Sequence, residues 1–347
     1  MVRFSDIIPT RPKRKPEIAS SEAERRRHKL WVSDSQIIEA GQIADTPQPV
    51  STTGHKRRIG EYYDALHRKA LDVRNRVKRD QGISPSPIIS ILHRIIENDL
   101  IDDLYAYGAT VLEGDQPAES ISITAGSLKV GKGLGYDTEK LIKLGLAAFL
   151  KNVGLYKVPD RVLQQERKLN NEEMEMIRSH PDMGAQVVGK MGAAYRWLAT
   201  VVRQVHERSD GSGYPEGLKG EEISELASII GIIDIYMAMT KDRPYRNKFP
   251  QTDAVKSVIG IEKNKFPPRV IKEFLNQISL FPVNAYVKLN NNSIGRVVST
   301  DKDKPMKPMI ELLYDGLGQR LQKGKTVNLA DSPLLHIVGT VDERNLP

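Results

Sequence analysis

Residues Val205–Pro215 read VHERSDGSGYP, and this stretch predicts the kind of site around which the chain is organised. It combines a potential metal ligand, His206, with the acidic residues Glu207 and Asp210. Glycine tolerates positive φ without strain, and glycine and proline together favour a tight turn. The stretch therefore predicts a loop whose backbone packs closely against the groups opposite it.

The end of this stretch carries a family signature. The loop resembles that of the HD-GYP family, a branch of the HD metal-dependent phosphohydrolases, whose signature reads HHExxDGxGYP. The loop positions that match are Asp210, Gly211, Gly213, Tyr214 and Pro215. Four further segments match the family in order, namely Phe149–Asp160 (FLKNVGLYKVPD), His180-Pro181, Asp234 and Asp242–Arg246 (DRPYR). The resemblance covers roughly residues 85–280 and implies a fold of the HD type.

Length and composition favour several compact units in a soluble chain. The 347 residues exceed one typical domain, and 39% of them are apolar. No apolar run reaches the roughly 18 residues of a membrane span, and the N-terminus lacks a signal-peptide core. The chain has no cysteine, which fits a reducing compartment. We therefore expect a cytoplasmic protein without a membrane span.

Positive charge is concentrated in the first quarter of the chain. Residues 1–80 hold 18 Lys and Arg against 11 Asp and Glu, which is +7 of the total net charge of +8. Such clusters can engage nucleic acid or anionic lipid. The basic clusters Lys13–Lys15, Arg25–Arg27 and Lys56–Arg58 contain no aromatic residue for base stacking. A solvated basic tail is therefore the favoured interpretation, and we expect no nucleic-acid partner.

The predicted domain order is a basic, mostly disordered segment at 1–57, a helical region at 58–116, an all-α HD-GYP-like domain at 117–280, and a small β-barrel-like module at 281–347. The first segment is rich in proline and charge. The predicted helices are a short one around Asp34–Gln42, then Arg58–Arg79, Ile88–Thr110, Glu119–Gly133, a helix capped by Asp137 or Thr138 that runs to Leu150, Asn170 or Asn171 to His180, Ala193–Arg208 and Glu222–Thr240. The Arg58–Arg79 helix is amphipathic, and we assign it to self-association as a homodimer.

The last part of the chain changes to short apolar runs separated by Asn-Asn-Asn, Asp-Gly and Lys-Gly turns, as β-hairpins require. The predicted strands are Tyr286–Leu289, Ile294–Ser299, Met309–Tyr314, Gln319–Leu321, Thr326–Leu329 and Leu335–Val341. Many HD-GYP proteins carry a similar β tail.

The family resemblance implies hydrolysis of cyclic di-GMP with two or three Fe or Mn ions, which convert a bridging water into hydroxide. The HD pair of that site aligns with Lys151-Asn152. A lysine ammonium has three donors and no lone pair, so it cannot bind a metal at neutral pH. Asparagine keeps the shape of aspartate and loses its charge. These replacements remove the central bridging carboxylate.

The remaining candidate metal ligands are few. Val205 replaces the first histidine of the family's HH pair. The ligands that remain are His180, His206 and Asp234, with Glu119 aligned to the family's earliest histidine. Three ligands can hold one divalent ion, Fe or Mn, whereas the favoured interpretation is that no metal is bound. In that case the Lys151 ammonium fills the space of a lost metal, and its nitrogen lies within roughly 4 Å of Asp234 or Glu119.

The residues on the substrate side are better preserved. Arg243 and Arg246 match positions that the family uses on the phosphates of cyclic di-GMP, and guanidinium suits bidentate phosphate contact. Arg208 is a further nucleotide-binding candidate, although Arg208 and Asp210 could instead brace the loop and Arg243 could tie two helices together. Tyr214 belongs to the loop that the family uses for partner recognition, and packing against a neighbouring helix is its structural alternative.

Three functions follow. The first is a degenerate HD-GYP protein without efficient hydrolysis that acts as a binding module for cyclic di-GMP or as a protein-interaction module. The second is an active phosphodiesterase with a reduced, mononuclear metal site. The third is a purely structural dimerisation protein. Metal content and hydrolysis separate the first two, and titration with cyclic di-GMP separates the first from the third.

Overall fold

A computed structural model describes most of the chain after its N-terminal segment. The described residues are 52–110, 116–165, 167–240, 249, 251–262, 264–278, 281, 284–301, 304, 307–341 and 346–347. The chain divides into the units Met1–Gln48 and Pro49–Pro347, and every described residue lies in the second. The predicted disorder of the N-terminal segment and its short helix at Asp34–Gln42 therefore lie outside the described residues, except that Thr52–Arg57 are helical.

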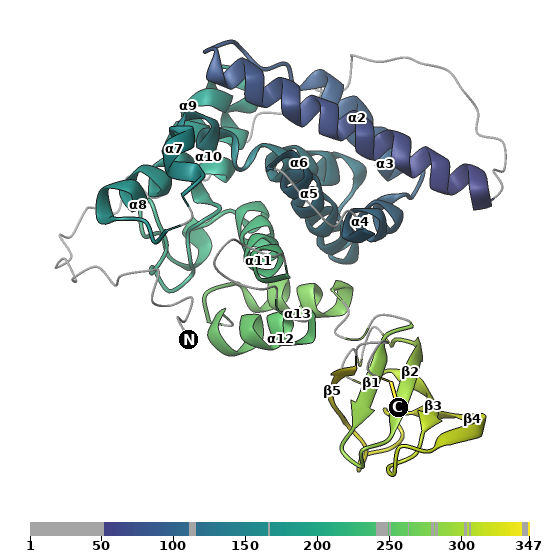
Figure 1. The fold of residues 1–347 in the computed structure, drawn as a ribbon. Helices are drawn as coiled ribbons and strands as arrows, with labels where there is room; N and C mark the ends of the chain where they lie inside the picture. The colour runs from purple at the N-terminus through teal and green to yellow at the C-terminus, as the bar shows by residue number, and fades with distance from the viewer. Residues whose placement is uncertain are drawn as a thin grey trace. The chain divides into compact units, whose positions relative to one another are not determined.

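Helix α2 (Thr52–Lys78) starts earlier than the predicted Arg58 and buries its apolar stripe inside its own chain. The buried residues are Ile59, Tyr63, Leu66, Ala70, Val73 and Val77. The helix packs against α3 (Ser86–Glu97), α4 (Ile101–Thr110), α5 (Gln116–Gly133) and the 3₁₀ helix Val153–Lys157. The apolar side chains of this stripe are covered by the chain's own core, so they do not support the expected self-association, which stays a prediction. Figure 1 shows α2 running alongside α3.

The predicted single helix at Ile88–Thr110 is two helices, α3 (Ser86–Glu97) and α4 (Ile101–Thr110). The break falls at Asp99, whose φ of 54° is left-handed and cannot continue a helix. The Asn98 side-chain amide donates to the Arg94 carbonyl at 2.8 Å and closes the end of α3. The apolar periodicity passes through this turn unchanged, which is why the sequence pattern concealed it.

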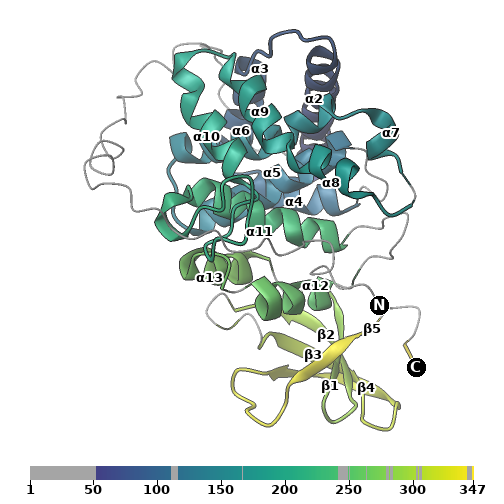
Figure 2. The same ribbon diagram turned by 90° about the vertical axis from the view of Figure 1, so that its left-hand side faces the viewer.

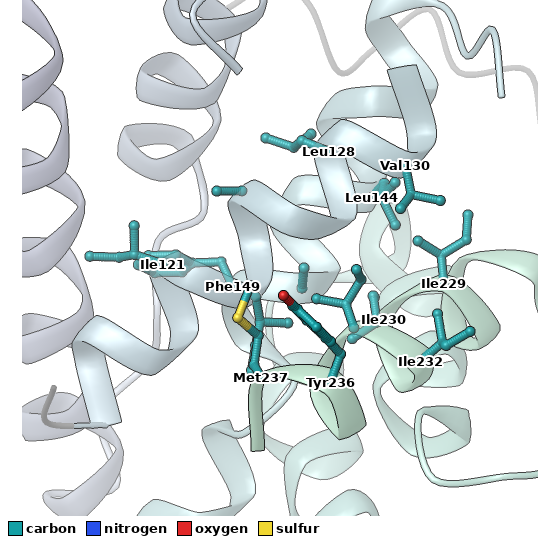
Figure 3. Packing of buried hydrophobic residues seen from close by; sticks show 14 of the residues in the cluster. Ile121, Leu128, Val130, Leu144, Phe149, Ile229, Ile230, Ile232, Tyr236 and Met237 are labelled. Carbon is teal, nitrogen blue, oxygen red and sulfur yellow. The ribbon is translucent and has the colours of Figure 1, made fainter. Parts of the chain in front are cut away.

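Helix α5 (Gln116–Gly133) is the central element, and it packs against α2, α4, α6 (Thr138–Leu150), α11 (Glu225–Thr240) and α13 (Pro268–Gln277). Two of its buried hydroxyl groups are satisfied within the helix, since Ser122 and Thr124 donate to carbonyls one turn earlier at 2.9 and 2.7 Å, whereas the buried Ser127 hydroxyl has no hydrogen-bond partner among the described residues. Apolar side chains of α5, α6 and α11 gather between the three helices (Figure 3). This packing fixes the end of α6 and the middle of α11, which carry residues of the candidate site.

The middle of the chain is more segmented than predicted. Asp137 caps α6 through the Lys140 amide, as predicted, and Asn170 forms a capping box with Glu173 at the start of α8 (Asn171–Arg178). Helix α8 ends before His180, which instead begins α9 (His180–Gly189). The predicted Ala193–Arg208 helix is a 3₁₀ turn (Ala193–Tyr195) followed by α10 (Arg196–Gln204). The remaining elements of this part are the 3₁₀ helices Val153–Lys157 and Gly220–Glu222 and the helix α7 (Asp160–Leu163).

The helical part closes with α12 (Gln251–Ser257), a π-helical segment (Val258–Glu262) and α13 (Pro268–Gln277). Helix α13 buries Val270 and Phe274 and packs against α5 and α11. The Phe274 ring meets Tyr236 of α11 edge-on, with ring centroids 5.6 Å apart. No helix in the described part of the chain is both long and apolar enough to cross a membrane.

The C-terminal module is an antiparallel sheet in the order β4-β3-β2-β1-β5. Its strands are β1 (Tyr286–Leu289), β2 (Ile294–Ser299), β3 (Met309–Tyr314), β4 (Arg320–Asn328) and β5 (Ile337–Val341) (Figure 2). Arg296 faces Glu311 across β2 and β3, and their side chains lie 2.9 Å apart. The two short strands predicted at Gln319–Leu321 and Thr326–Leu329 are one strand, so the predicted Lys-Gly turn is wrong.

Candidate functional site

A buried lysine lies at the centre of the candidate site. Lys151 follows the last residue of α6, and its side chain is 2% exposed. Its Nζ lies 2.8 Å from Oδ1 of Asp234 on α11 and donates to Oδ1 of Asn152 at 2.9 Å. The predicted contact between Lys151 and one of the two carboxylates is confirmed, and the carboxylate is Asp234. The ammonium therefore lies beside the carboxylate that a metal would need.

The two candidate histidines face each other beside this ion pair. Nε2 of His206 lies 3.1 Å from Nε2 of His180, and Nδ1 of His180 lies 2.7 Å from the Ile177 carbonyl oxygen. Since the carbonyl can only accept, Nδ1 of His180 carries a proton and its Nε2 is an acceptor in the neutral ring. His206 must then donate from Nε2. The hydrogen bonds thus form one directed chain from His206 through His180 to the backbone.

The environment of the pair keeps both rings neutral. Burial lowers the pKa of His180 to about 4; the Lys151 charge lowers it further, while the Ile177 carbonyl and Asp234 oppose the shift. Burial also lowers the pKa of His206, with His180, Lys151 and Arg208 acting in the same direction. Neutral imidazoles beside one ion pair leave this cluster without net charge at neutral pH.

Tyr214 of the GYP loop covers His206. The two rings are stacked, with centroids 4.9 Å apart and planes 2° apart. The Arg178 guanidinium lies 5.7 Å from the centre of the Tyr214 ring, within range of a cation–π interaction. Tyr214 therefore packs on a candidate ligand rather than only on a neighbouring helix, and its predicted role in partner recognition stays a prediction.

The loop is held by a residue that the sequence reasoning did not assign to any role. The buried Glu207 carboxylate accepts three successive backbone amides, those of Glu216 at 2.6 Å, Gly217 at 3.1 Å and Leu218 at 3.0 Å. Burial raises the pKa of Glu207, although the three amides oppose the shift. The only sign of this role in the sequence was the position of an acidic residue directly after His206.

The two loop glycines are required for different reasons. Gly211 has a φ of 79°, as its position in the turn predicts. Gly213 is needed instead for close approach, because a Cβ there would lie 2.4 Å from the Glu207 Cα and the Arg208 amide nitrogen. The predicted positive φ is therefore found at Gly211, while close backbone approach is the requirement at Gly213.

Arg208 and Asp210 brace this loop. Arg208 donates to the carbonyls of Val205 and Glu207 at 3.2 and 2.7 Å, and its guanidinium lies 4.9 Å from the centre of the Phe266 ring. Asp210 accepts from the amide and hydroxyl of Ser212 at 2.9 and 2.6 Å. These contacts favour the alternative that Arg208 and Asp210 brace the loop, since polar atoms of both side chains are bonded within it.

The other predicted site residues are placed differently. Glu119 lies in the first turn of α5 and is partly exposed. Across the residues that the structure describes, no three His, Asp or Glu side chains are grouped in a way that could hold a metal ion. Arg243 and Arg246 fall outside the described residues, and so does the rest of Asp242–Arg246.

Two family models match the chain. The HD domain matches residues 99–270, and the KOW domain associated with HD domain matches residues 286–347. A cyclic di-GMP phosphodiesterase of Pseudomonas aeruginosa is 26% identical over 257 residues, which is 74% of this chain and 58% of that protein. The cyclic di-GMP phosphodiesterase PdeB of Borreliella burgdorferi is 28% identical over 62% of this chain and 56% of its own length.

The chain belongs to the HD-GYP family. This HD-GYP chain spans little more than half the length of the two relatives described above. Among solved structures, Bd1817, a HDG"Y"P protein from Bdellovibrio bacteriovorus, is 17% identical over 65% of this chain and 73% of its own, with a TM-score of 0.46. This last similarity is too weak to add to the comparisons of sequence.

The residues present do not fit the paired metal ions implied for an HD-GYP enzyme. Paired cations need several lone pairs and enough negative charge to offset their repulsion. Here the ammonium of Lys151 already neutralises Asp234, and the two imidazoles carry no charge. A metal ion in this cluster would meet a fixed positive charge instead of the bridging carboxylate.

Proposed function

We propose that this HD-GYP chain binds a cyclic dinucleotide of the cyclic di-GMP class without hydrolysing it efficiently. The observation that carries the proposal is the contact between the buried Lys151 ammonium and Asp234 at 2.8 Å. A binding module of this kind reports the concentration of the nucleotide through its own surface, and the GYP loop is the surface we propose for a protein partner.

The loss of hydrolysis follows from the chemistry of the site. Bound metal ions would supply a hydroxide nucleophile and polarise the phosphate. The Lys151 ammonium has no lone pair, so it can do neither, although it can attract an anion. His206 donates its Nε2 proton to His180, so neither Nε2 can activate a water, and only Nδ1 of His206 keeps a lone pair outside this hydrogen-bond chain. The chain thus retains positive charge and lacks a nucleophile.

Support for nucleotide binding comes from the relatives and from the DRPYR segment. The relatives include cyclic di-GMP phosphodiesterases and a 3'3'-cGAMP-specific phosphodiesterase of Vibrio cholerae, which is 28% identical over 164 residues. The sequence has arginines at positions 243 and 246, and the planar guanidinium group suits contact with phosphate oxygens. We propose these two arginines as the phosphate contacts, and we assign Arg208 to the loop scaffold.

One observation favours an alternative, a phosphodiesterase with a single metal ion. Two imidazole nitrogens bound to one ion at about 2.1 Å in tetrahedral geometry are about 3.4 Å apart, close to the 3.1 Å between His180 and His206. A third ligand would have to come from Asp234, which already contacts Lys151. Two neutral ligands alone are too few for a stable catalytic site, so we prefer binding without hydrolysis.

Two assays on the same preparation test the proposal. Calorimetric titration with cyclic di-GMP should give saturable binding, and Arg243→Ala should weaken it by about tenfold or more, since a charge-assisted contact contributes about 1.5–3 kcal/mol. Arg320→Ala, an exposed arginine of β4, is the matched control and should bind like the wild type. Incubation with cyclic di-GMP and Mn²⁺ should give no product.

The remaining outcomes separate the alternatives. Turnover with one Mn²⁺ per chain would establish the mononuclear enzyme in place of the binding module. The lack of any binding heat, with the protein folded, would leave a purely structural protein or an interaction module that acts through the GYP loop without nucleotide.

A further inference from the structure

Four segments that are distant in the sequence converge on the candidate site. They are the junction after α6 (Lys151 and Asn152), the start of α9 (His180), the turn after α10 (His206) and the middle of α11 (Asp234). Residues that bind a shared metal cluster would hold such segments together through the ions. A chain without the cluster needs another way to hold them.

We infer that two direct contacts replace the metal ions as the links between these segments, and that the site is a latent metal site which Lys151 keeps closed. The first contact is the Lys151–Asp234 ion pair, which joins α6 to α11. The second is the hydrogen bond between His206 and His180, which joins the turn after α10 to α9. This inference deepens the proposed loss of hydrolysis and rests on it.

The ion pair is largely shielded from solvent. The Lys151 side chain is 2% exposed and that of Asp234 is 16% exposed. A buried charge that loses its partner is strongly destabilising, whereas replacement of both charges by apolar groups is often neutral. In a metal-free core, each of Lys151 and Asp234 therefore offsets the free-energy cost of burying the charge of the other.

The histidine pair needs no ion for its geometry. The proton chain from His206 through His180 to the Ile177 carbonyl satisfies three of the four ring nitrogens, and the Tyr214 ring covers His206. Both imidazoles are thus neutral and hydrogen-bonded. Burial lowers the pKa of each ring and keeps it neutral. These contacts keep the two nitrogen ligands next to each other in the absence of a metal.

The substitutions that would reopen the site follow directly. Lys151→His removes the competing cation, adds one imidazole and frees Asp234. Asn152→Asp restores a carboxylate in nearly the same shape. Together with His180 and His206 they give three imidazoles and two carboxylates, which is a donor set suited to Fe²⁺ or Mn²⁺.

The test compares the metal content of the Lys151→His/Asn152→Asp variant with that of the wild type after incubation with Mn²⁺ and gel filtration. The variant should retain stoichiometric Mn²⁺, and its melting temperature should rise with added Mn²⁺ and fall again with EDTA. Lys157→His, which adds a histidine to the adjacent 3₁₀ helix outside the site, is the control and should retain no more Mn²⁺ than the wild type. A folded double variant that takes up no more metal than this control would overturn the inference.

A second pair of variants decides the matter if the first does not fold. Lys151→Met should lower the melting temperature clearly, and the added Asp234→Leu change should restore most of the loss, because both charges are then gone. A Lys151→Met variant as stable as the wild type would overturn the inference. Failure of the wild type to bind cyclic di-GMP would remove the proposed function alone, whereas two metal ions per wild-type chain would overturn both.

Discussion

The imidazole of His206 is stacked on the phenol ring of Tyr214, with the ring planes 2° apart. The edge of His180 approaches His206, with ring centroids 4.8 Å apart and an interplanar angle of 77°. The signature loop is thus in direct contact with His206 and is linked to His180 through His206. A substitution in the loop is therefore expected to change the packing of His206 and, through it, of His180.

The stack leads to the first prediction. Tyr214→Phe keeps the ring and should change the free energy of unfolding by less than about 0.5 kcal/mol. Tyr214→Ala removes both the aromatic pair and the buried ring area, and it should cost about 2 kcal/mol. Urea unfolding followed by circular dichroism measures both values. Equal losses in the two variants would show that the hydroxyl, not the ring, stabilises the loop.

Glu207 provides the second prediction. In Glu207→Gln one oxygen is replaced by an NH₂ group, so one of the three amide contacts becomes a donor facing a donor. The variant should lose about 1–3 kcal/mol of unfolding free energy. Glu221→Gln, an exposed acid in the nearby 3₁₀ helix Gly220–Glu222, should be neutral. If both variants unfold at the wild-type midpoint, Glu207 does not hold the loop.

Gly154 provides the third prediction, because the 3₁₀ helix after α6 touches the start of α9 there. A methyl group at this position would lie 1.9 Å from the His180 carbonyl oxygen and 2.6 Å from the Gly184 amide nitrogen. Gly154→Ala should therefore cost at least about 3 kcal/mol and disturb His180. Gly189→Ala at the end of α9 meets nothing within 4 Å and should be neutral or slightly stabilising. A fully stable Gly154→Ala would contradict the close approach.

The buried histidines predict a loss of stability in acid. The pKa of His180 is about 4 in the folded protein, below its ordinary value of 6.5. The unfolded chain therefore binds more protons between these values, so stability is complete above pH 6.5 and decreases as the pH falls towards 4. The decrease assigned to His180 is on the order of 3 kcal/mol. His180→Gln should flatten the dependence compared with that of the wild type. Identical pH profiles in the variant and the wild type would exclude His180 as the cause.

The sequence predicted the fold class well because the apolar periodicity of the long helices and the turn residues of the sheet are local signals. Asp137 at the start of α6 and Asn170 at the start of α8 were readable as caps for the same reason. The break at Asp99 was missed because apolar spacing continues on both sides of it. Local sequence patterns also could not reveal that the apolar stripe of α2 packs inside its own chain.

The sequence predicted the part of the candidate site that depends on the charge and the lone pairs of each side chain. A lysine at position 151 has no lone pair for a metal, and its need for a carboxylate partner in a buried place follows from the sequence and physical chemistry. The role of Glu207 was not predictable. Its three amide partners lie nine to eleven residues later in the chain, and the sequence does not show that the backbone returns to Glu207 there. The contact that requires Gly154 likewise exists only in three dimensions.

The most direct test is the metal content of the wild-type protein, produced in medium supplemented with Fe and Mn and measured by mass spectrometry after removal of loosely bound ions. We predict far less than one ion per chain, because the Lys151 ammonium occupies the charge-balancing position beside Asp234. Two ions per chain, retained by the folded wild type, would contradict the account.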